Sequence, residues 1–249
     1  TMKRLDNLGG DCVDEDNTVE GAVPAVGPNG QIYVAWSGPL VRNSQFVIFF
    51  NKSTDGGSTW LPSAQPIAQQ PGGWDYMING IQRANGMPIT CCDISNSPYR
   101  GYIYINWTDS AGPNNHDVKF IRSTNGGVNW SAPMKVNNDT SNKEQFFCWM
   151  TVDQKTGYIY ILYYDRRDDV SNANATHVYI TKSTNGGAST TGSSRSGAST
   201  CTTARWDSTP VASTWCTWRW RGRRESRAPR GARPRGGALP GPARAGLAA

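Results

Sequence analysis

The chain has 249 residues, with 25 basic and 19 acidic side chains and a net charge of +6. The charge is divided unevenly. Residues 1–187 carry a net charge of −3, whereas residues 188–249 hold 11 Arg against Asp207 and Glu225, a net charge of +9. The basic character therefore belongs to the tail, and it does not indicate that the body of the protein binds nucleic acid or acidic membranes.

Neither a membrane span nor a signal peptide is expected. No apolar run approaches the ~18 residues that a membrane helix requires. The first ten residues, TMKRLDNLGG, lack the apolar stretch of a signal peptide, and Thr1 precedes Met2. We therefore expect the sequence to be a fragment, with any export signal lying upstream of it.

Composition favours strands over helices. The body is dense in Gly, Asn, Tyr and Trp, which suit turns and pleated strands. No stretch of about 12 residues has apolar positions at helical spacing, whereas short alternating runs bounded by Gly, Pro, Asn and Asp recur. The sequence thus predicts an all-β chain.

Three segments repeat one strand pattern, and they read GQIYVAWSG at 30–38, GYIYINWTD at 101–109 and GYIYILYYD at 157–165. Each opens with Gly, and period-2 alternation places side chains such as Ile32, Val34 and Trp36 on one face. The opposite face is also largely apolar. Each of these strands is therefore expected to lie between two neighbouring sheets.

Each repeated strand belongs to a longer unit. A short strand and a turn precede it, with the first strands beginning near residues 23, 89 and 149. A third strand follows, at 46–53, 116–123 and 176–183, and leads into a tight Gly-Gly turn with room for a fourth strand. The opening glycines are 71 and 56 residues apart. Four-stranded units at this spacing predict the blades of a β-propeller.

The three tight turns read STDGGSTW at 53–60, STNGGVNW at 123–130 and STNGGAST at 183–190. The residues of such a turn indicate how it is stabilised. The carboxylate of Asp55 is placed to accept hydrogen bonds from backbone N–H groups of its own turn, and Gly56 and Gly57 tolerate positive φ. Ser53 is placed to bond back across the turn, and Trp60 adds apolar area that holds the turn against its sheet. Asn in the second and third turns keeps the acceptor oxygen.

These turns carry a resemblance to a known family. The first resembles in full the Asp-box, S-x-D-x-G-x-T-W, of sialidases and related β-propellers, also named the bacterial neuraminidase repeat. The second and third have Asn for Asp, and the third lacks the Trp. The matching positions are Ser53, Asp55, Gly57, Trp60, Ser123, Asn125, Gly127, Trp130, Ser183, Asn185 and Gly187. The resemblance implies that these residues are structural, and that about three blades of a six-bladed propeller are present.

Three regions follow from this reading. Residues 1–18 are an acidic lead-in, residues 19–187 are the incomplete set of blades, and residues 188–249 are an Arg-, Gly- and Pro-rich tail. The tail has no Asn, Ile, Lys, Phe, Tyr, Met, Gln or His, so it cannot bury enough apolar surface to offset the entropy of ordering. We expect it to be disordered or read out of frame. The alternative is a genuine disordered tail in which Arg and Trp contact nucleic acid.

Acidic residues end two of the repeated strands at the same position, Asp109 and Asp165, and the third repeat continues into Arg166 and Arg167. Such an acid–Arg cluster would bind an anionic sugar, or form a solvated rim. In sialidases a similar stretch borders the active site, so the resemblance makes Asp165 and Arg166 candidate catalytic residues, and Asp109 and Arg167 candidate ligand-binding residues. The sequence assigns no nucleophile.

The rest of the sialidase pattern is missing. Sialidases open the first blade with Arg-Ile-Pro, whose Arg holds the substrate carboxylate through its planar fork. Here Ala22 stands in that position, before Val23 and Pro24, and we place Phe147 at the corresponding position of the third unit. Neither side chain can hold a carboxylate.

Further ligand candidates lie near the expected channel mouth. Glu20 precedes the first strand. Trp74 and Asp75 are expected in a loop between the first two units, where they would either contact a sugar or fill a gap between blades.

No metal site or cofactor is expected with one exception. The acidic run of Asp11, Asp14, Glu15, Asp16 and Asn17 offers oxygen ligands for Ca²⁺, although without EF-hand spacing. His and Cys are not at zinc-ligand spacing. Adjacent Cys91 and Cys92 point to opposite faces of a strand, so they are not expected to form a disulfide with each other.

The resemblance implies a secreted or surface protein that interacts with a glycan or glycoprotein, inactive in this form and binding no nucleic acid. Two alternatives stay open: an exo-acting glycoside hydrolase of the sialidase type whose catalytic blades are missing, and a propeller for protein–protein interaction. The oligomeric state is not predicted. An unclosed set of blades exposes strand edges, and we expect the isolated chain to be poorly soluble.

Overall fold

The computed structural model describes residues 2–8, 17–112, 115–192 and 194–195. Within these ranges all regular secondary structure is β, as predicted, and there are no helices. Consequently no helix of the described chain is long and apolar enough to cross a membrane.

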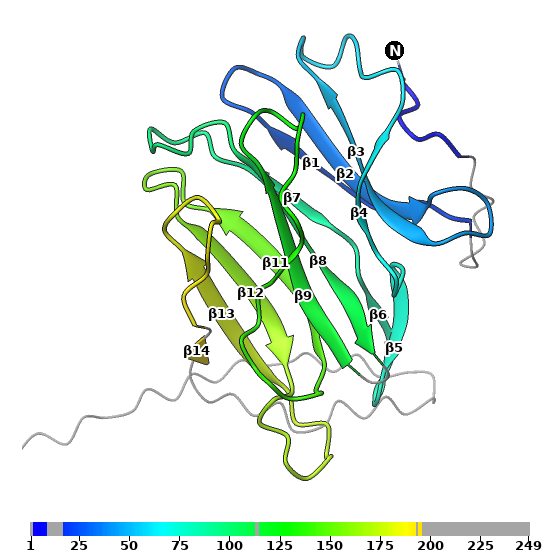
Figure 1. The fold of residues 1–249 in the computed structure, drawn as a ribbon, viewed down its shortest axis with the longest axis vertical. Coiled ribbons are helices and arrows are strands. Elements are labelled where there is room, and N and C mark those ends of the chain that lie inside the picture. The colour runs from blue at the N-terminus through cyan, green and yellow to red at the C-terminus, as the bar shows by residue number, and fades with distance from the viewer. Residues whose placement is uncertain (1, 9–16, 113–114, 193, 196–249) are drawn as a thin grey trace, which may run out of the picture. The chain divides into compact units, whose positions relative to one another are not determined.

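Twelve of the strands form three four-stranded antiparallel sheets (Figure 1). Sheet 1 contains β1 (Glu20–Val26), β2 (Ile32–Pro39), β3 (Phe46–Ser53) and β4 (Gln65–Gln69). Sheet 2 contains β7 (Ile89–Cys92), β8 (Ile103–Gly112), β9 (Asn115–Ser123) and β10 (Met134–Lys135). Sheet 3 contains β11 (Gln145–Val152), β12 (Ile159–Asp165), β13 (His177–Ser183) and β14 (Ser194–Arg195). The predicted order of strands within each unit is confirmed.

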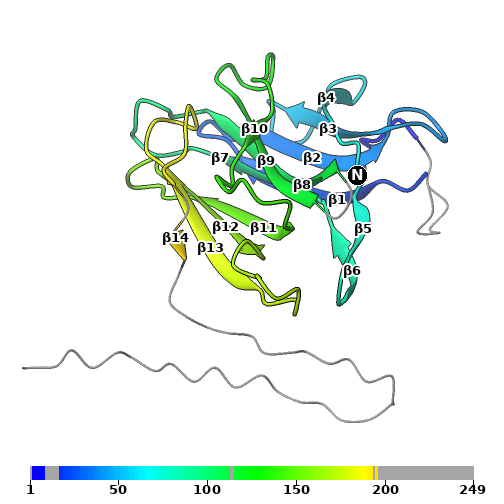
Figure 2. The same ribbon diagram turned by 60° about the horizontal axis from the view of Figure 1, so that its bottom comes forward.

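The sheets follow one another in chain order, face against face (Figure 2). The first strands of the three units are neighbours in succession, because β1 contacts β7 and β7 contacts β11. The sequence left open whether these strands or the Gly-opened strands are innermost. The contacts show that the first strand of each unit lies on the shared inner side.

Two apolar cores join the sheets. Tyr33 and Phe50 of sheet 1 pack against Ile105 and Trp107 of sheet 2. Tyr104 and Phe120, on the other face of sheet 2, pack against the side chains of sheet 3. The central strand β8 is therefore buried on both faces, as its two-sided apolar pattern predicts.

The outer sheets differ from that expectation. On the outer face of sheet 1, Trp36 and Val34 are covered by Leu5 and Val19 rather than by another sheet. On the outer face of sheet 3, Trp149 is 62% exposed, and Leu162 and Tyr164 are each 38% exposed. Apolar alternation predicts which faces favour burial, but it does not say whether a neighbour is present to cover them.

One hairpin was not predicted. Strands β5 (Asp75–Ile78) and β6 (Ile81–Asn85) form a two-stranded sheet in the segment between sheets 1 and 2. Ile78 and Ala84 pack against Phe146 at the start of β11. The interpretation of Trp74 and Asp75 as loop residues was thus wrong for Asp75, which begins β5. Strands β5 and β6 are short and of mixed polarity, so their sequences show no clear period of 2. The hairpin is stabilised by contacts with residues that are distant in sequence.

The hydrogen-bonded structure extends past residue 187. Thr191 N–H donates to the Lys182 carbonyl at 2.7 Å, and β14 pairs with β13 at Tyr179 and Ile180. The fourth strand expected from the repeat is therefore present in all three sheets. Most of the segment that the sequence identified as a disordered or out-of-frame tail lies outside the described residues.

Candidate functional site

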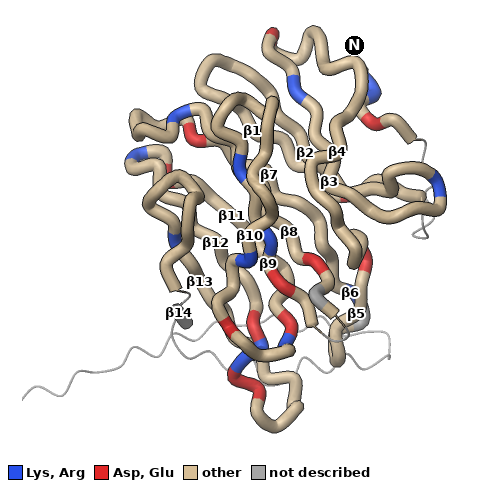
Figure 3. The backbone as a smooth tube through the Cα atoms, viewed as in Figure 1, with Lys and Arg blue, Asp and Glu red and all other residues tan. Residues whose placement is uncertain are grey.

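The two ends of the sheets carry different chemistry. Strands β3, β9 and β13 each run into one of the Gly-Gly turns, which we define as residues 53–60, 123–130 and 183–190. Strand β12 ends at Asp165 at the opposite end, which we call the loop end. Charged residues of both signs gather at the loop end of sheets 2 and 3 (Figure 3). The acid–Arg cluster and the Gly-Gly turns are therefore separated by the length of the sheet.

The first Gly-Gly turn contains the hydrogen bonds that the sequence predicts. Asp55 Oδ1 accepts from the Thr59 N–H at 2.8 Å, and Asp55 Oδ2 accepts from the Thr59 hydroxyl at 2.6 Å. Ser53 Oγ accepts from the Gly57 N–H at 2.8 Å. Hydrogen bonds from Thr59 and Ser53 lower the pKa of Asp55 to about 2. Gly56 and Gly57 have φ of 71° and 93°. The Asp55 carboxylate is thus held within its own turn.

The other two Gly-Gly turns use Asn in the same way. Asn125 Oδ1 accepts from the Asn129 N–H at 2.9 Å. Asn185 Oδ1 accepts from the Ser189 N–H at 3.0 Å. Ser123 and Ser183 accept from the second Gly of their turns at 2.8 Å and 3.1 Å. The amide oxygen therefore replaces the carboxylate without loss of the backbone hydrogen bond.

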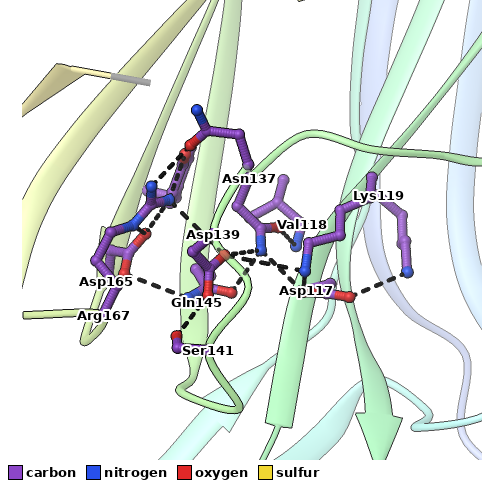
Figure 4. A network of polar contacts seen from close by, with 12 residues as sticks. Asp117, Val118, Lys119, Asn137, Asp139, Ser141, Gln145, Asp165 and Arg167 are labelled. Atoms are coloured by element: carbon purple, nitrogen blue, oxygen red, sulfur yellow. Dashed lines mark hydrogen bonds and ion pairs between the residues drawn. The ribbon is translucent and has the colours of Figure 1, made fainter. Parts of the chain in front are cut away.

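A buried ion pair lies at the loop end of sheet 3 (Figure 4). Asp165 is fully buried, and its Oδ2 accepts from Arg167 Nε at 2.8 Å and lies 2.6 Å from Arg167 Nη2. The Arg167 guanidinium also lies over the Tyr179 ring, 4.4 Å from its centroid. Burial alone would lower the pKa of Arg167, but the hydrogen bond and charge of Asp165 raise it. Asp165 and Arg167 therefore satisfy each other.

The network continues to sheet 2 through amide side chains. Gln145 Nε2 donates to Asp165 Oδ1 at 3.2 Å, and Gln145 Oε1 accepts from Asn137 Nδ2 at 2.6 Å. Asn137 Nδ2 also donates to Asp117 Oδ1 at 2.8 Å, and Lys135 Nζ lies 2.8 Å from the same oxygen. Burial would raise the pKa of Asp117, but Asn137 and Lys135 together hold it below its ordinary value. This network ties the loop ends of sheets 2 and 3 together.

Arg166 is separate from that network. Its side chain is buried, with Nε donating to Thr176 Oγ1 at 3.1 Å and Nη1 lying 3.8 Å from Glu144 Oε2. The guanidinium also lies over the Phe146 ring, 5.4 Å from its centroid. Burial lowers the pKa of Arg166, and Glu144 opposes this. Arg166 therefore binds protein groups on several sides and is not directed at solvent.

Asp109 occupies the equivalent position of sheet 2, but its surroundings differ. It is 4% exposed, and its Oδ1 accepts from the Gly72 and Ser110 N–H groups at 2.9 and 2.8 Å. Burial raises the pKa of Asp109. The structure brings Asp109 to the segment before β5, and not to Asp165 or Arg167.

The remaining candidates lie apart from the acid–Arg cluster. Trp74 is 2% exposed and donates from Nε1 to the Thr18 carbonyl at 3.2 Å, so its ring fills a gap and is not available to stack on a sugar. Asp75 lies 3.7 Å from Arg83 on the hairpin. Glu20 lines a shallow hollow with Leu5, Ala22 and Trp36 on the outer side of sheet 1.

The bulges of the innermost strands correct one equivalence. Register shifts in β1 between Glu20 and Val23, and in β11 between Phe146 and Trp149. Gly21 and Phe147 are the first residues inside these bulges, with φ of 72° and 50°. The residue equivalent to Ala22 is therefore Cys148, not Phe147 as the sequence suggested. Cys148 is buried and, like Ala22, has no guanidinium for a carboxylate.

The candidate calcium site cannot be compared with the structure, because Asp11, Asp14, Glu15 and Asp16 lie outside the described residues. Asn17 is described, and its side chain hydrogen-bonds to Asn43. Within the described part of the chain, no group of three or more His, Cys, Asp or Glu residues could hold a metal ion.

Sequence reasoning missed three members of the network that joins sheets 2 and 3, Asp117, Asn137 and Gln145, and it missed Glu144, which pairs with Arg166. It also missed a stacked pair in which the rings of Tyr76 and His116 lie 4.2 Å apart. Burial lowers the pKa of His116 and raises that of Tyr76. For Asp117 the sequence offered one signal, its position, because Asp117 pairs directly with the candidate residue Asp109 across β8 and β9.

No family model matches the chain, and no curated protein matches it. Solved structures are similar at low identity. The Hadza microbial sialidase Hz136 is 17% identical, with a TM-score of 0.46, over 69% of this chain and 36% of that chain. A GH93 alpha-L-arabinofuranosidase of Fusarium graminearum, solved with arabinobiose, is 15% identical, with a TM-score of 0.47, over 74% of this chain and 50% of that chain.

A polysaccharide lyase, the PL25 ulvan lyase, is 17% identical, with a TM-score of 0.43, over 72% of this chain and 40% of that chain. The chain spans between about a third and a half of the length of these three structures. At these identities and TM-scores the similarity does not identify an activity.

Proposed function

We propose that the chain forms three blades of a sialidase-like β-propeller that binds glycans or glycoproteins outside the cell or at its surface, and that it does not hydrolyse sialosides. The observation that carries the proposal is the Gly-Gly turn, which closes the third strand of each four-stranded sheet with the same Ser and Asp or Asn hydrogen bonds. The Asp-box resemblance connects this turn to sialidases and related propellers.

The proposal that sialosides are not hydrolysed rests on the positions of the arginines. A sialidase holds the carboxylate of its substrate with arginine forks directed at the ligand. Here Arg167 is paired with Asp165, and Arg166 is buried among Thr176 and Glu144. Ala22 stands in the position of the Arg in the Arg-Ile-Pro motif. Moving either arginine toward a ligand would leave a buried carboxylate unpaired, which costs several kcal/mol, typically ~3–5.

The test combines a fluorogenic sialoside assay with glycan-array binding of the chain. We expect array binding without release of fluorophore. We propose the loop end, where charged residues of both signs gather, as the binding surface, so replacing Lys143 there by Ala should weaken binding. The matched control is Lys155→Ala in the β11–β12 turn at the opposite end. Turnover would favour the exo-glycosidase alternative, and no binding to any glycan would favour a propeller for protein–protein interaction.

A further inference from the structure

Neighbouring sheets are joined by a contact that repeats from one pair to the next. Lys52, one residue before the Ser of the first Gly-Gly turn, donates from Nζ to the Gly126 carbonyl of the second turn at 2.6 Å. Arg122, at the same position in sheet 2, donates from Nη1 to the Gly186 carbonyl of the third turn at 2.7 Å. A basic residue of each sheet thus holds the first Gly of the next turn.

An apolar contact repeats beside it. A Cβ on Gly127 would lie 2.5 Å from Phe50 of sheet 1, and a Cβ on Gly187 would lie 2.7 Å from Phe120 of sheet 2. Both aromatic residues stand three positions before the Ser of their own turn. The second Gly of each turn therefore receives an aromatic ring from the preceding sheet.

Sheet 3 has residues at the same positions, which we call the donor surface, but among the described residues there is no further Gly-Gly turn for them to contact. Lys182 and Ile180 stand at the positions of Lys52 and Phe50. Lys182 Nζ lies 4.1 Å from the centroid of the Tyr158 ring instead of reaching a glycine carbonyl. Leu162 and Tyr164 are 38% exposed, whereas the residues at their positions in sheets 1 and 2 are fully buried. Those residues are Ala35, Ser37, Asn106 and Thr108.

Sheet 1 carries the matching glycines, which we call the recipient surface, and in the described chain no residue of another sheet contacts them. A Cβ on Gly57 would meet only Ile32 and Trp60 of its own sheet, at 3.4 and 4.0 Å. Gly30 shows the same vacancy, because a Cβ there would meet nothing within 4 Å, whereas its equivalents Gly101 and Gly157 face atoms of the preceding sheet. One chain therefore holds both halves of a contact that it makes twice internally.

We infer that sheet 3 docks on sheet 1 of a second copy of this chain, with Lys182 donating to the carbonyl of Gly56 in that copy and Ile180 packing on Gly57. The contact is head-to-tail, and the three described sheets of each of two copies would close a ring of six, within the range of known propellers. The docked sheet replaces Leu5, whose carbonyl accepts from Asn51 on the outer face of sheet 1. This inference does not depend on glycan binding.

Sedimentation velocity over a concentration series tests the inference. We expect the full chain to dimerise, and two substitutions to weaken dimerisation at least tenfold: Leu162→Glu on the donor surface and Gly57→Asn on the recipient surface. Asn tolerates the left-handed conformation, with φ of 93° at this position. Asn7→Ala, which removes the hydrogen bond to Ser63, should strengthen dimerisation by loosening the segment that includes Leu5.

Mixing the two weakened variants tests whether the contact between copies is head-to-tail. Leu162→Glu keeps an intact recipient surface and Gly57→Asn keeps an intact donor surface, so an equimolar mixture should regain a 1:1 complex. The controls are Val170→Glu, at a side chain that is 95% exposed, and Gly126→Asn, at a turn position with nothing within 4 Å of its Cβ. Both should dimerise like the unmodified chain, with urea midpoints matched to those of the test variants at a protein concentration where all copies are separate. A monomeric chain, or a mixture that does not associate, would overturn the inference.

Discussion

Asp165 and Arg167 are candidate site residues in the sequence, but in the structure they contact each other and stabilise the fold. The carboxylate is fully buried, and the guanidinium side chain is 15% exposed. Two charges removed from water stabilise a fold only when each has its partner, and loss of one partner leaves the other unpaired. The sequence predicts that these residues lie together, but it does not reveal that they face each other.

Replacing Asp165 by Asn should therefore be costly. The buried guanidinium of Arg167 would lose its nearest carboxylate and keep the more distant Asp139, at 3.8 Å, so we expect a loss of about 3 kcal/mol of unfolding free energy. Urea denaturation measures it. Asp6→Asn provides the control, because the Arg4–Asp6 pair, with Arg4 62% exposed, should leave the urea midpoint close to that of the unmodified chain. Equal midpoints for both variants would contradict the buried-pair account.

Asp55 should give the first Gly-Gly turn a pH dependence that the other two turns lack. Its folded-state pKa of about 2 lies below the ordinary value of 3.8, so its contribution to stability is present above about pH 4 and is lost as the pH falls toward 2. In Asp55→Asn, the amide supplies the acceptor at every pH, as Asn125 does. The difference in urea midpoint between the two proteins should shrink between pH 5 and pH 2.5, and a constant difference would contradict the prediction.

At the scale of elements, the Gly-Gly turn joins local conformation to packing between sheets. Gly126 and Gly127 both have positive φ, of 67° and 79°, but only Gly127 faces Phe50 of the neighbouring sheet. The first glycine is required by the backbone alone, and the second by the backbone and by the ring that approaches it.

The two glycines should respond differently to Ala. Gly126→Ala incurs only the strain of a left-handed residue, about 1–2 kcal/mol. Gly127→Ala adds a Cβ 2.5 Å from Phe50 Cε1, so overpacking should increase the loss by about 1–3 kcal/mol more. Thermal or urea unfolding of the pair gives the comparison. Similar losses at the two positions would show that the Phe50 contact contributes little.

Elements with a strong local signal were predicted, and those that depend on distant contacts were not. The Gly-opened strands and the third strands alternate clearly, and the structure forms them as β2, β3, β8, β9, β12 and β13. The β5–β6 hairpin has no such pattern and packs on Phe146, some 60 residues away in sequence. The loop-end network likewise depends on Asn137 and Gln145, which join only when sheets 2 and 3 are in contact.

At the scale of the described molecule, sheet 2 is the only one covered by another sheet on both faces. Its strand β8 contributes Ile103, Tyr104, Ile105 and Trp107, none of which is exposed. Sheets 1 and 3 each contribute one face to a shared core, and the outer face of sheet 3 is open. Stability within the chain should therefore be graded from the centre outward.

Hydrogen exchange should reveal that gradient. We expect amides of β8 and β9 to exchange slowest and those of β12 and β13 faster. Those of the two-stranded β5–β6 sheet should exchange fastest among these strands, because each of its strands has only one partner. Mass spectrometry of peptides after timed exchange measures the order at low protein concentration, where copies are separate. Slower exchange in sheet 3 than in sheet 2 would contradict the gradient.

The adjacent cysteines of β7 can report separately on the two cores between the sheets. Cys91 packs toward sheet 3, whereas Cys92 belongs to the core shared with sheet 1, as expected for neighbours on one strand, and neither forms a disulfide. Burial raises the pKa of their thiols to about 11 and about 12, so neither reacts as a thiolate while its core is closed. Alkylation at Cys91 would record separation of sheets 2 and 3, and alkylation at Cys92 would record separation of sheets 1 and 2. The alkylation rates of two adjacent residues thereby measure the opening of two different cores.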